Sequence, residues 1–284
     1  FRFLRAVLRT ASGAGRDHTL SGGFALSSLL KREPLVVGAA LLTIALLAWA
    51  YVVGLAAGMN AASPDMAGMD MQAMPGMNMT EPNFRAWTPA LFVFMFSMWA
   101  VMMVGMMLPS AVPMILIYTQ VARQATTLGK TFVSAGWFTT GYLLAWIVFS
   151  FLATSAQWAL EQAALLSPTM VSVSPIFGGI VLIAAGFYQF TPVKDACLAR
   201  CRAPLSFVQQ HGGFKGDAYG ATRLGALHGF YCIGCCWVLM ALLFVGGVMN
   251  ILWIAGLMVF ILLEKVLPGG RYLSLLAGFA VASA

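Results

Sequence analysis

Seven methionines crowd one polar stretch of the chain, residues 59–79. The residues between them are mainly small or polar, and Pro64 and Pro75 interrupt any helical repeat. Packing in an apolar core therefore does not explain these methionines. Thioethers are soft ligands that select Cu(I), and they form no disulfides in an oxidising compartment. The stretch predicts a loop that binds Cu(I), and silver would bind similarly; a low-complexity linker or an adaptable protein-binding surface is the alternative. Its candidate ligands are Met66, Met69, Met71, Met74, Met77 and Met79.

A second group of six methionines lies between residues 95 and 107. On a helix, Met95, Met98, Met102 and Met106 fall within an arc of about 80°. A stripe of methionines in a membrane helix serves packing as readily as ligation, so both interpretations stay open. The sequence LPSAVP at 108–113 predicts a break in the helix, and broken helices often mark sites in transporters. The candidate ligands here are Met102, Met103, Met106 and Met107.

The five cysteines form two compact groups, one of which follows a histidine. On a helix, the motif H-x3-C-x2-C-C at 228–236 gathers soft ligands on one face. Binding of Cu(I) or zinc fits these residue types. A C-x-x-C redox pair and plain packing of small apolar side chains are the alternatives. The candidate ligands are Cys197, Cys201, His228, Cys232, Cys235 and Cys236.

No motif for a phosphate-binding loop, a serine nucleophile elbow or a zinc protease occurs in the sequence. We therefore expect no enzyme, with a membrane thiol–disulfide oxidoreductase as the alternative.

The composition requires a bilayer around the elements that position these residues. Hydrophobic residues make up 61% of the 284, and charged residues only 9%. Runs of about 20 apolar residues predict spanning helices. The sequence thus predicts an all-α transmembrane helical bundle of six spans and a short C-terminal apolar helix. The predicted organisation is a basic N-terminal segment (1–34), a first span (35–57), a Met-rich loop (58–85), and a five-span membrane domain (86–284) that contains a Cys-bearing loop (191–223).

The predicted spans inside the five-span domain have distinct limits. The second runs from about Pro89 to Leu108 and continues as an interfacial extension. The third is Phe132–Ser155 and the fourth is Ile176–Phe190. The run Leu224–Leu263 makes two crossings that are separated near Gly246 and Gly247.

Charge sets the predicted orientation. Fifteen of the 16 Lys and Arg residues, Lys194 and Lys265 among them, fall in loops on one predicted side. By the positive-inside rule that side is cytoplasmic. The Met-rich loop is then periplasmic, and the protein is predicted in the bacterial inner membrane with a cytoplasmic N-terminus. The net charge of +7 reflects topology and anionic lipid, and we expect no nucleic acid as a partner. The predicted spans carry no charge, which argues against a proton relay.

Four stretches carry a resemblance to a known family: WAVMMVGMMLPS at 99–110, GYLLAW at 141–146, YQFTPVKDACLARCRAP at 188–204 and HGFYCIGCCWVLMALLFVGGVMNILW at 228–253. Over about residues 88–284, the chain resembles a family of bacterial integral membrane proteins described as predicted metal-binding or copper-chaperone-like. The resemblance implies a multi-helix membrane protein in which the Met and Cys motifs bind metal. The outer Met-rich loop lies outside the matched stretches.

These observations predict an inner-membrane protein that handles copper, by Cu(I) binding, transfer or facilitated transport. The loop would capture Cu(I), the Met stripe would guide or store it, and the Cys/His cluster would form a tighter inner site. The alternative is an accessory or assembly subunit of a larger membrane complex, such as a copper enzyme. A copper-dependent membrane enzyme or a periplasmic copper donor is the expected partner.

Overall fold

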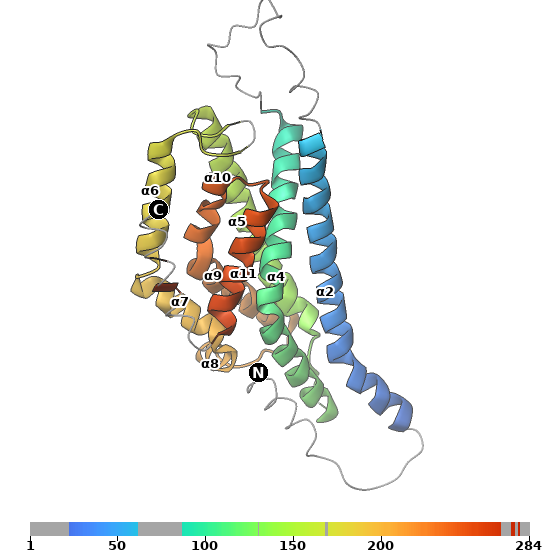
Figure 1. Cartoon of the computed structure of the whole chain (residues 1–284). Helices are drawn as coiled ribbons and strands as arrows, with labels where there is room; N and C mark the ends of the chain where they lie inside the picture. Colours follow the sequence, from blue (N-terminus) through green and yellow to red (C-terminus); the bar gives the residue numbers. More distant parts are fainter. Residues whose placement is uncertain are drawn as a thin grey trace, which may run out of the picture.

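The chain is helical in the computed structural model, which describes residues 23–61, 87–129, 131–167 and 170–267, together with 274, 275 and 278. Within these residues no strand forms beyond one isolated bridge between Leu166 and Ser172. The predicted all-α class is therefore confirmed (Figure 1). The helices are α2 (Gly23–Ala61), α4 (Pro89–Thr127), α5 (Ala135–Gln162), α6 (Pro175–Tyr188), α7 (Pro192–Arg202), α8 (Pro204–Gln210), α9 (Ala218–Ala241), α10 (Leu243–Gly246) and α11 (Ile251–Val266).

Four described helical stretches are long and apolar enough to cross a membrane: Val36–Gly58 in α2, α4, α5, and α9 with α10. A fifth results if α6 and α7, which meet at a bend of 63°, are taken as one broken span. Helix α11 has 16 residues, fewer than the about 20 that a straight crossing needs. Four to five candidate spans therefore stand among the described residues, and the sixth stays a prediction.

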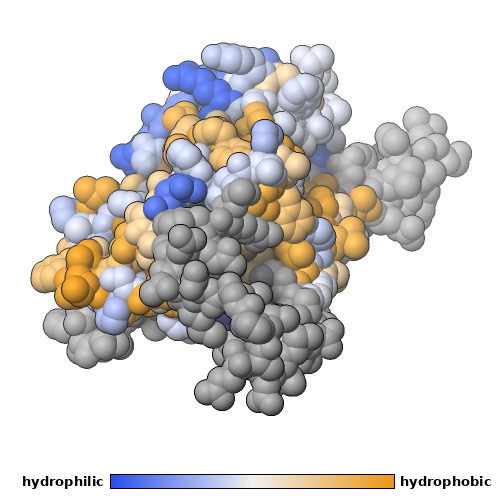
Figure 2. Space-filling view, turned by 90° about the horizontal axis from the view of Figure 1, so that it is seen from above, coloured by the Kyte–Doolittle hydropathy of each residue, from blue (hydrophilic) through white to orange (hydrophobic). Residues whose placement is uncertain are grey.

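The outward faces of these helices carry large apolar side chains. Leu47, Ile176 and Leu252 are 65%, 76% and 85% exposed. Figure 2, which looks down on the bundle, shows hydrophobic residues around much of its described periphery. Such a surface is too apolar for water and suits lipid.

Helix α4 does not break where the sequence predicted. It begins at Pro89, capped by the side chain of Thr88, and continues to Thr127 through Pro109 and Pro113. Beside the prolines, the hydroxyl groups of Ser110 and Tyr142 both donate to the carbonyl of Met107, at 2.8 and 3.0 Å. Pro109 and Pro113 remove the donors to the carbonyls of Gly105 and Pro109, and the packing of α4 against α2 and α5 holds the helix through this stretch. The predicted break in the helix at 108–113 is wrong, and the end of the span at Leu108 stays a prediction.

Helices α5 and α9 make the most extensive contact in the bundle. A Cβ atom at Gly141 would lie 1.9 Å from the carbonyl oxygen of Thr222, and one at Gly225 would lie 1.9 Å from that of Phe138. Only glycine leaves room for main chains this close, as is common between membrane helices. The close approach sets the side chains of α5 directly against those of α9.

Helix α11 returns into the bundle after a sharp turn. Gly247 has a φ of 93°, which favours glycine, and the side chain of Asn250 caps the first turn of α11. The predicted separation near Gly246 and Gly247 is therefore confirmed. From there α11 packs against α4, α7 and α2.

Charges that the sequence analysis assigned to loops are buried inside this bundle. Lys194 of α7 is 0% exposed and pairs with Glu264 of α11, which is 2% exposed, through contacts of 2.8 and 3.0 Å. Gln189 accepts a further bond from Lys194, and Ser274 donates to Glu264 at 2.6 Å. Lys265, the next residue on α11, is also buried. The interior is thus not free of charge, because the last turn of α11 brings two charged side chains into it.

Candidate functional site

Cysteines from two helices meet in the interior. Cys201 of α7 lies beside Cys232 and Cys235 on α9, and Cys236 lies beside the same two thiols. The three cysteines of α9 are buried, and Cys201 is partly so. All five cysteines of the chain are free thiols. The sequence placed its two cysteine groups apart, and the fold joins them through Cys201. We call Cys201, Cys232, Cys235 and Cys236 the thiol cluster.

Two thiols of this cluster bond to the backbone of their own helix. Cys235 and Cys236 donate to the backbone carbonyl of Cys232, at 3.1 and 3.0 Å. Across the described part of the chain, no group of three or more His, Cys, Asp or Glu side chains is arranged to hold a metal ion. A metal would therefore require these thiols to rotate away from the carbonyl.

Two residues outside the predicted ligand set contact Cys232, namely Lys265 and Tyr142, and a third, Ser110, contacts Lys265. The ammonium group of Lys265 lies 2.9 Å from its sulfur and 3.0 Å from the hydroxyl of Ser110. The hydroxyl of Tyr142 lies 3.2 Å from the same sulfur. Cationic and hydroxyl donors of this kind stabilise negative charge on sulfur. The sequence offered one signal, a Glu-Lys pair that directly follows a long apolar run.

His228 lies one turn before Cys232 in an aromatic surround. Its ring centre is 5.2 Å from that of Phe207 and 5.9 Å from those of Phe138 and Tyr142. The side chain is buried, and its Nδ1 atom has no hydrogen-bond partner among the described residues. An unpaired buried nitrogen costs free energy, so this atom is available to a ligand.

Cys197 is on the same helix as Cys201 but packs elsewhere. A Cβ atom at Gly234 would lie 2.8 Å from the Cys197 sulfur, so this thiol rests against α9 at that glycine. The hydroxyl of Tyr188 donates to the carbonyl of Gly234 beside it. Cys197 thus borders the thiol cluster without a hydrogen bond to it in this arrangement.

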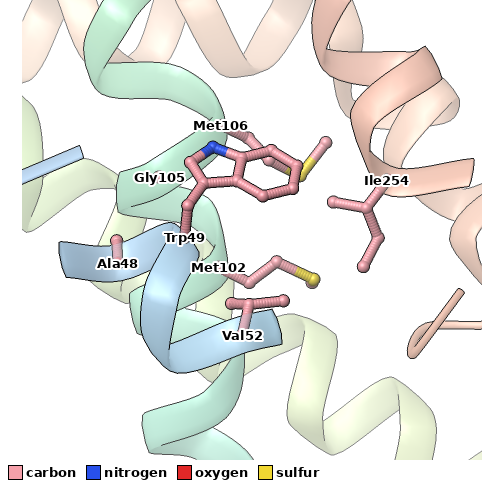
Figure 3. A pocket seen from close by; sticks show the side chains of 7 residues that line it. All are labelled: Ala48, Trp49, Val52, Met102, Gly105, Met106 and Ile254. Carbon is pink, nitrogen blue, oxygen red and sulfur yellow. The ribbon is translucent and has the colours of Figure 1, made fainter. Parts of the chain in front are cut away.

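The methionines of α4 are buried, and the structure separates them into two sets. Met102 and Met106 line a small, partly open pocket between α2, α4 and α11. Figure 3 shows their side chains with Trp49 and Ile254 around the same space. Met103 and Met107 are fully buried and do not line it. The candidate ligands Met66, Met69, Met71, Met74, Met77 and Met79 lie outside the described residues.

Comparison with known proteins bears directly on this arrangement. A family model described as PpoB2, copper chaperone, matches residues 96–284. The match includes the thiol cluster and the methionines from Met98 to Met107. No curated protein and no solved structure matches the chain. Because this family model covers about two-thirds of the sequence, the chain belongs to the PpoB2 copper chaperone family.

Proposed function

We propose that this protein binds Cu(I) at the thiol cluster and carries it within the bacterial inner membrane. The observation that carries the proposal is the meeting of Cys201 from α7 with three buried cysteines from α9. Thiolates are the side chains that select Cu(I) most strongly. Membership of a copper chaperone family supports the choice of copper over zinc or silver.

The surroundings of the cluster suit a cation that is bound and then released. Several thiolates around one Cu(I) carry excess negative charge, and the ammonium group of Lys265, 2.9 Å from Cys232, offsets part of it. Tyr142 supplies a hydroxyl group on the same side. His228, with its free Nδ1 one turn away, is the nearest nitrogen ligand that the ion could recruit.

We further propose that Cu(I) moves inward from the periplasmic side. The Met-rich loop captures Cu(I) on the periplasmic side, and α4 guides it toward the thiol cluster. Six spans with a cytoplasmic N-terminus are part of this proposal.

The chain then transfers its copper to a partner, such as a copper-dependent membrane enzyme, in an accessory role. Co-purification of that enzyme from native membranes, dependent on the thiol cluster, tests the accessory role.

The binding test compares two cysteines of α7. Purified protein in detergent is titrated anaerobically with Cu(I) against a chromogenic chelator, for wild type, Cys201→Ser and Cys197→Ser. Cys201→Ser is expected to weaken binding at least about tenfold, because even residues behind the ligands are worth 10–100-fold. Cys197→Ser is the matched control, with an expected change below about threefold, because the Cys197 sulfur rests against α9 at Gly234.

Replacement of the three cysteines of α9 gives the result that would overturn the proposal. The triple variant Cys232→Ser/Cys235→Ser/Cys236→Ser must lose the tight Cu(I) equivalent. If its stoichiometry and affinity equal those of wild type, the thiol cluster is not the copper site. A change of thiol titre with a quinone in place of Cu(I) binding would instead support the oxidoreductase alternative.

A further inference from the structure

A pocket at the centre of α4 is built from two thioethers and an indole. Met102 and Met106, one turn apart on α4, line it together with Trp49 and Val52 of α2 and Ile254 of α11. Both methionines are buried, at 2% and 3% exposure. In Figure 3 the sulfur atoms of both methionines lie within the space that Trp49 and Ile254 border.

The pocket depends on the glycine between the two methionine pairs. A Cβ atom at Gly105 would lie 3.2 Å from the Cβ of Ala48 and 3.5 Å from the Cδ1 of Trp49. The absence of a side chain at Gly105 therefore lets α2 lie close to α4 and brings the indole of Trp49 to the pocket. Met102 lies three residues before Gly105 and Met106 one residue after it, and Figure 3 shows both side chains near the indole.

This combination has a specific chemistry. Two thioethers form a neutral, soft pair of ligands for a d¹⁰ monovalent ion. An indole face attracts a cation, and the attraction strengthens where water is excluded. The lining residues include no charged side chain, so a divalent ion would find no anionic ligand there. We propose that Met102, Met106 and Trp49 form a second Cu(I) site, in which the two sulfurs ligate the ion and the indole covers it.

The position of the pocket links it to the thiol cluster. Ser110, which contacts Lys265 at the cluster, follows Met106 by four residues on α4. At about 1.5 Å per residue the two positions are about 6 Å apart along the helix. Met106 therefore lies about one helical turn from Ser110, which reaches the cluster through Lys265. The inference rests on the proposed function in taking Cu(I) as the cargo, and it adds a weaker site that the ion occupies before the thiols.

The test uses the fluorescence of Trp49 with Ag(I), a d¹⁰ ion that does not change oxidation state. The purified full chain in detergent is titrated with silver nitrate while tryptophan emission is recorded. Wild type is expected to show a saturable quench that is absent from Trp49→Phe. In Trp49→Phe, bound silver measured by mass spectrometry should persist with affinity weakened between about twofold and thirtyfold.

Two double variants in α4 test whether Met102 and Met106 hold the silver ion. Met102→Leu/Met106→Leu should abolish the Trp49-dependent quench. Met103→Leu/Met107→Leu, the matched control, should retain it, because these two side chains are buried outside the pocket. If the first variant quenches like wild type, or if both lose the quench equally while circular dichroism shows intact helices, the pocket is not a silver or copper site.

A variant without the cluster thiols separates silver binding at the pocket from binding at the thiol cluster. The quench is repeated in Cys201→Ser/Cys232→Ser/Cys235→Ser/Cys236→Ser, in which the cluster cannot bind. A persistent quench there supports the second site even if the cluster proposal fails. Loss of the quench only in this background would show that silver near Trp49 depends on the thiols, and would overturn the pocket as a site of its own.

Discussion

The buried ion pair between Lys194 and Glu264 offers a quantitative test of how α7 is held in place. Glu264→Gln removes the negative charge and leaves the Lys194 ammonium, 0% exposed, without its counter-ion. Breaking one side of a buried pair costs about 3–5 kcal/mol. Lys194→Met leaves the carboxylate unpaired and should cost a similar amount. The double variant Lys194→Met/Glu264→Gln removes both charges, and its cost should fall to about 2 kcal/mol or less.

These values predict a coupling energy of at least about 4 kcal/mol between the two positions. The measurement is SDS-induced unfolding of the purified protein in detergent, followed by circular dichroism. Lys215→Met is the control, because Lys215 is exposed and its replacement should change the free energy of unfolding by less than about 0.5 kcal/mol. Costs of the two single variants that simply add in the double variant would refute the reasoning. So would single variants as stable as Lys215→Met.

The same pair has a consequence for the thiol cluster. Lys194 lies two turns before Cys201 on α7, and its partner Glu264 is next to Lys265 on α11. Loss of the pair should therefore loosen α7 and expose Cys201. Each single variant should raise the rate at which Cys201 reacts with a maleimide, and the double variant should raise it less. An unchanged rate in the single variants would show that other contacts hold α7.

Two further substitutions test the packing around the site. Gly225→Ala sets a Cβ atom 1.9 Å from the carbonyl of Phe138 and should destabilise the protein by about 3 kcal/mol or more, because two main chains must separate. Gly179→Ala, where nothing lies within 4 Å, should leave the free energy of unfolding equal or slightly higher, and equal costs in the two variants would contradict the argument. Tyr142→Phe removes the hydroxyl that joins the Met107 carbonyl to the thiol cluster and should cost about 1 kcal/mol. Tyr219→Phe, at a position 79% exposed, should cost nothing measurable in the same unfolding assay.

The sequence was sufficient for the features that depend on local composition. Apolar runs predicted the helical class, and the glycines at 246 and 247 predicted where α10 and α11 separate. The spacing of His228, Cys232 and Cys235 predicted that they share a helix face. Each of these inferences needs only the period of a helix and the properties of single residues.

Features that depend on distant partners could not be predicted in this way. Whether Lys194 is exposed or buried depends on Glu264, 70 positions later, and the apolar run before Glu264 gave no reason to extend the span to it. The contact of Cys201 with the cysteines of α9 depends on the bend between α6 and α7. The prolines of α4 predicted a break because their effect was judged from α4 alone, whereas α2 and α5 pack against the helix there.

The Cu(I) affinities of the two proposed copper sites are expected to depend differently on pH. Thiols must lose their protons to bind Cu(I), so the affinity of the thiol cluster should rise with pH. Thioethers carry no proton, so the affinity of the pocket formed by Met102 and Met106 should not change between about pH 6 and about pH 8. The chelator competition in wild type measures the first dependence. The Trp49 quench in the chain with Cys201, Cys232, Cys235 and Cys236 replaced by serine measures the second. A pocket affinity that rose with pH as steeply as that of the cluster would mean that silver near Trp49 is held by a titrating ligand, and thioethers alone would not account for it.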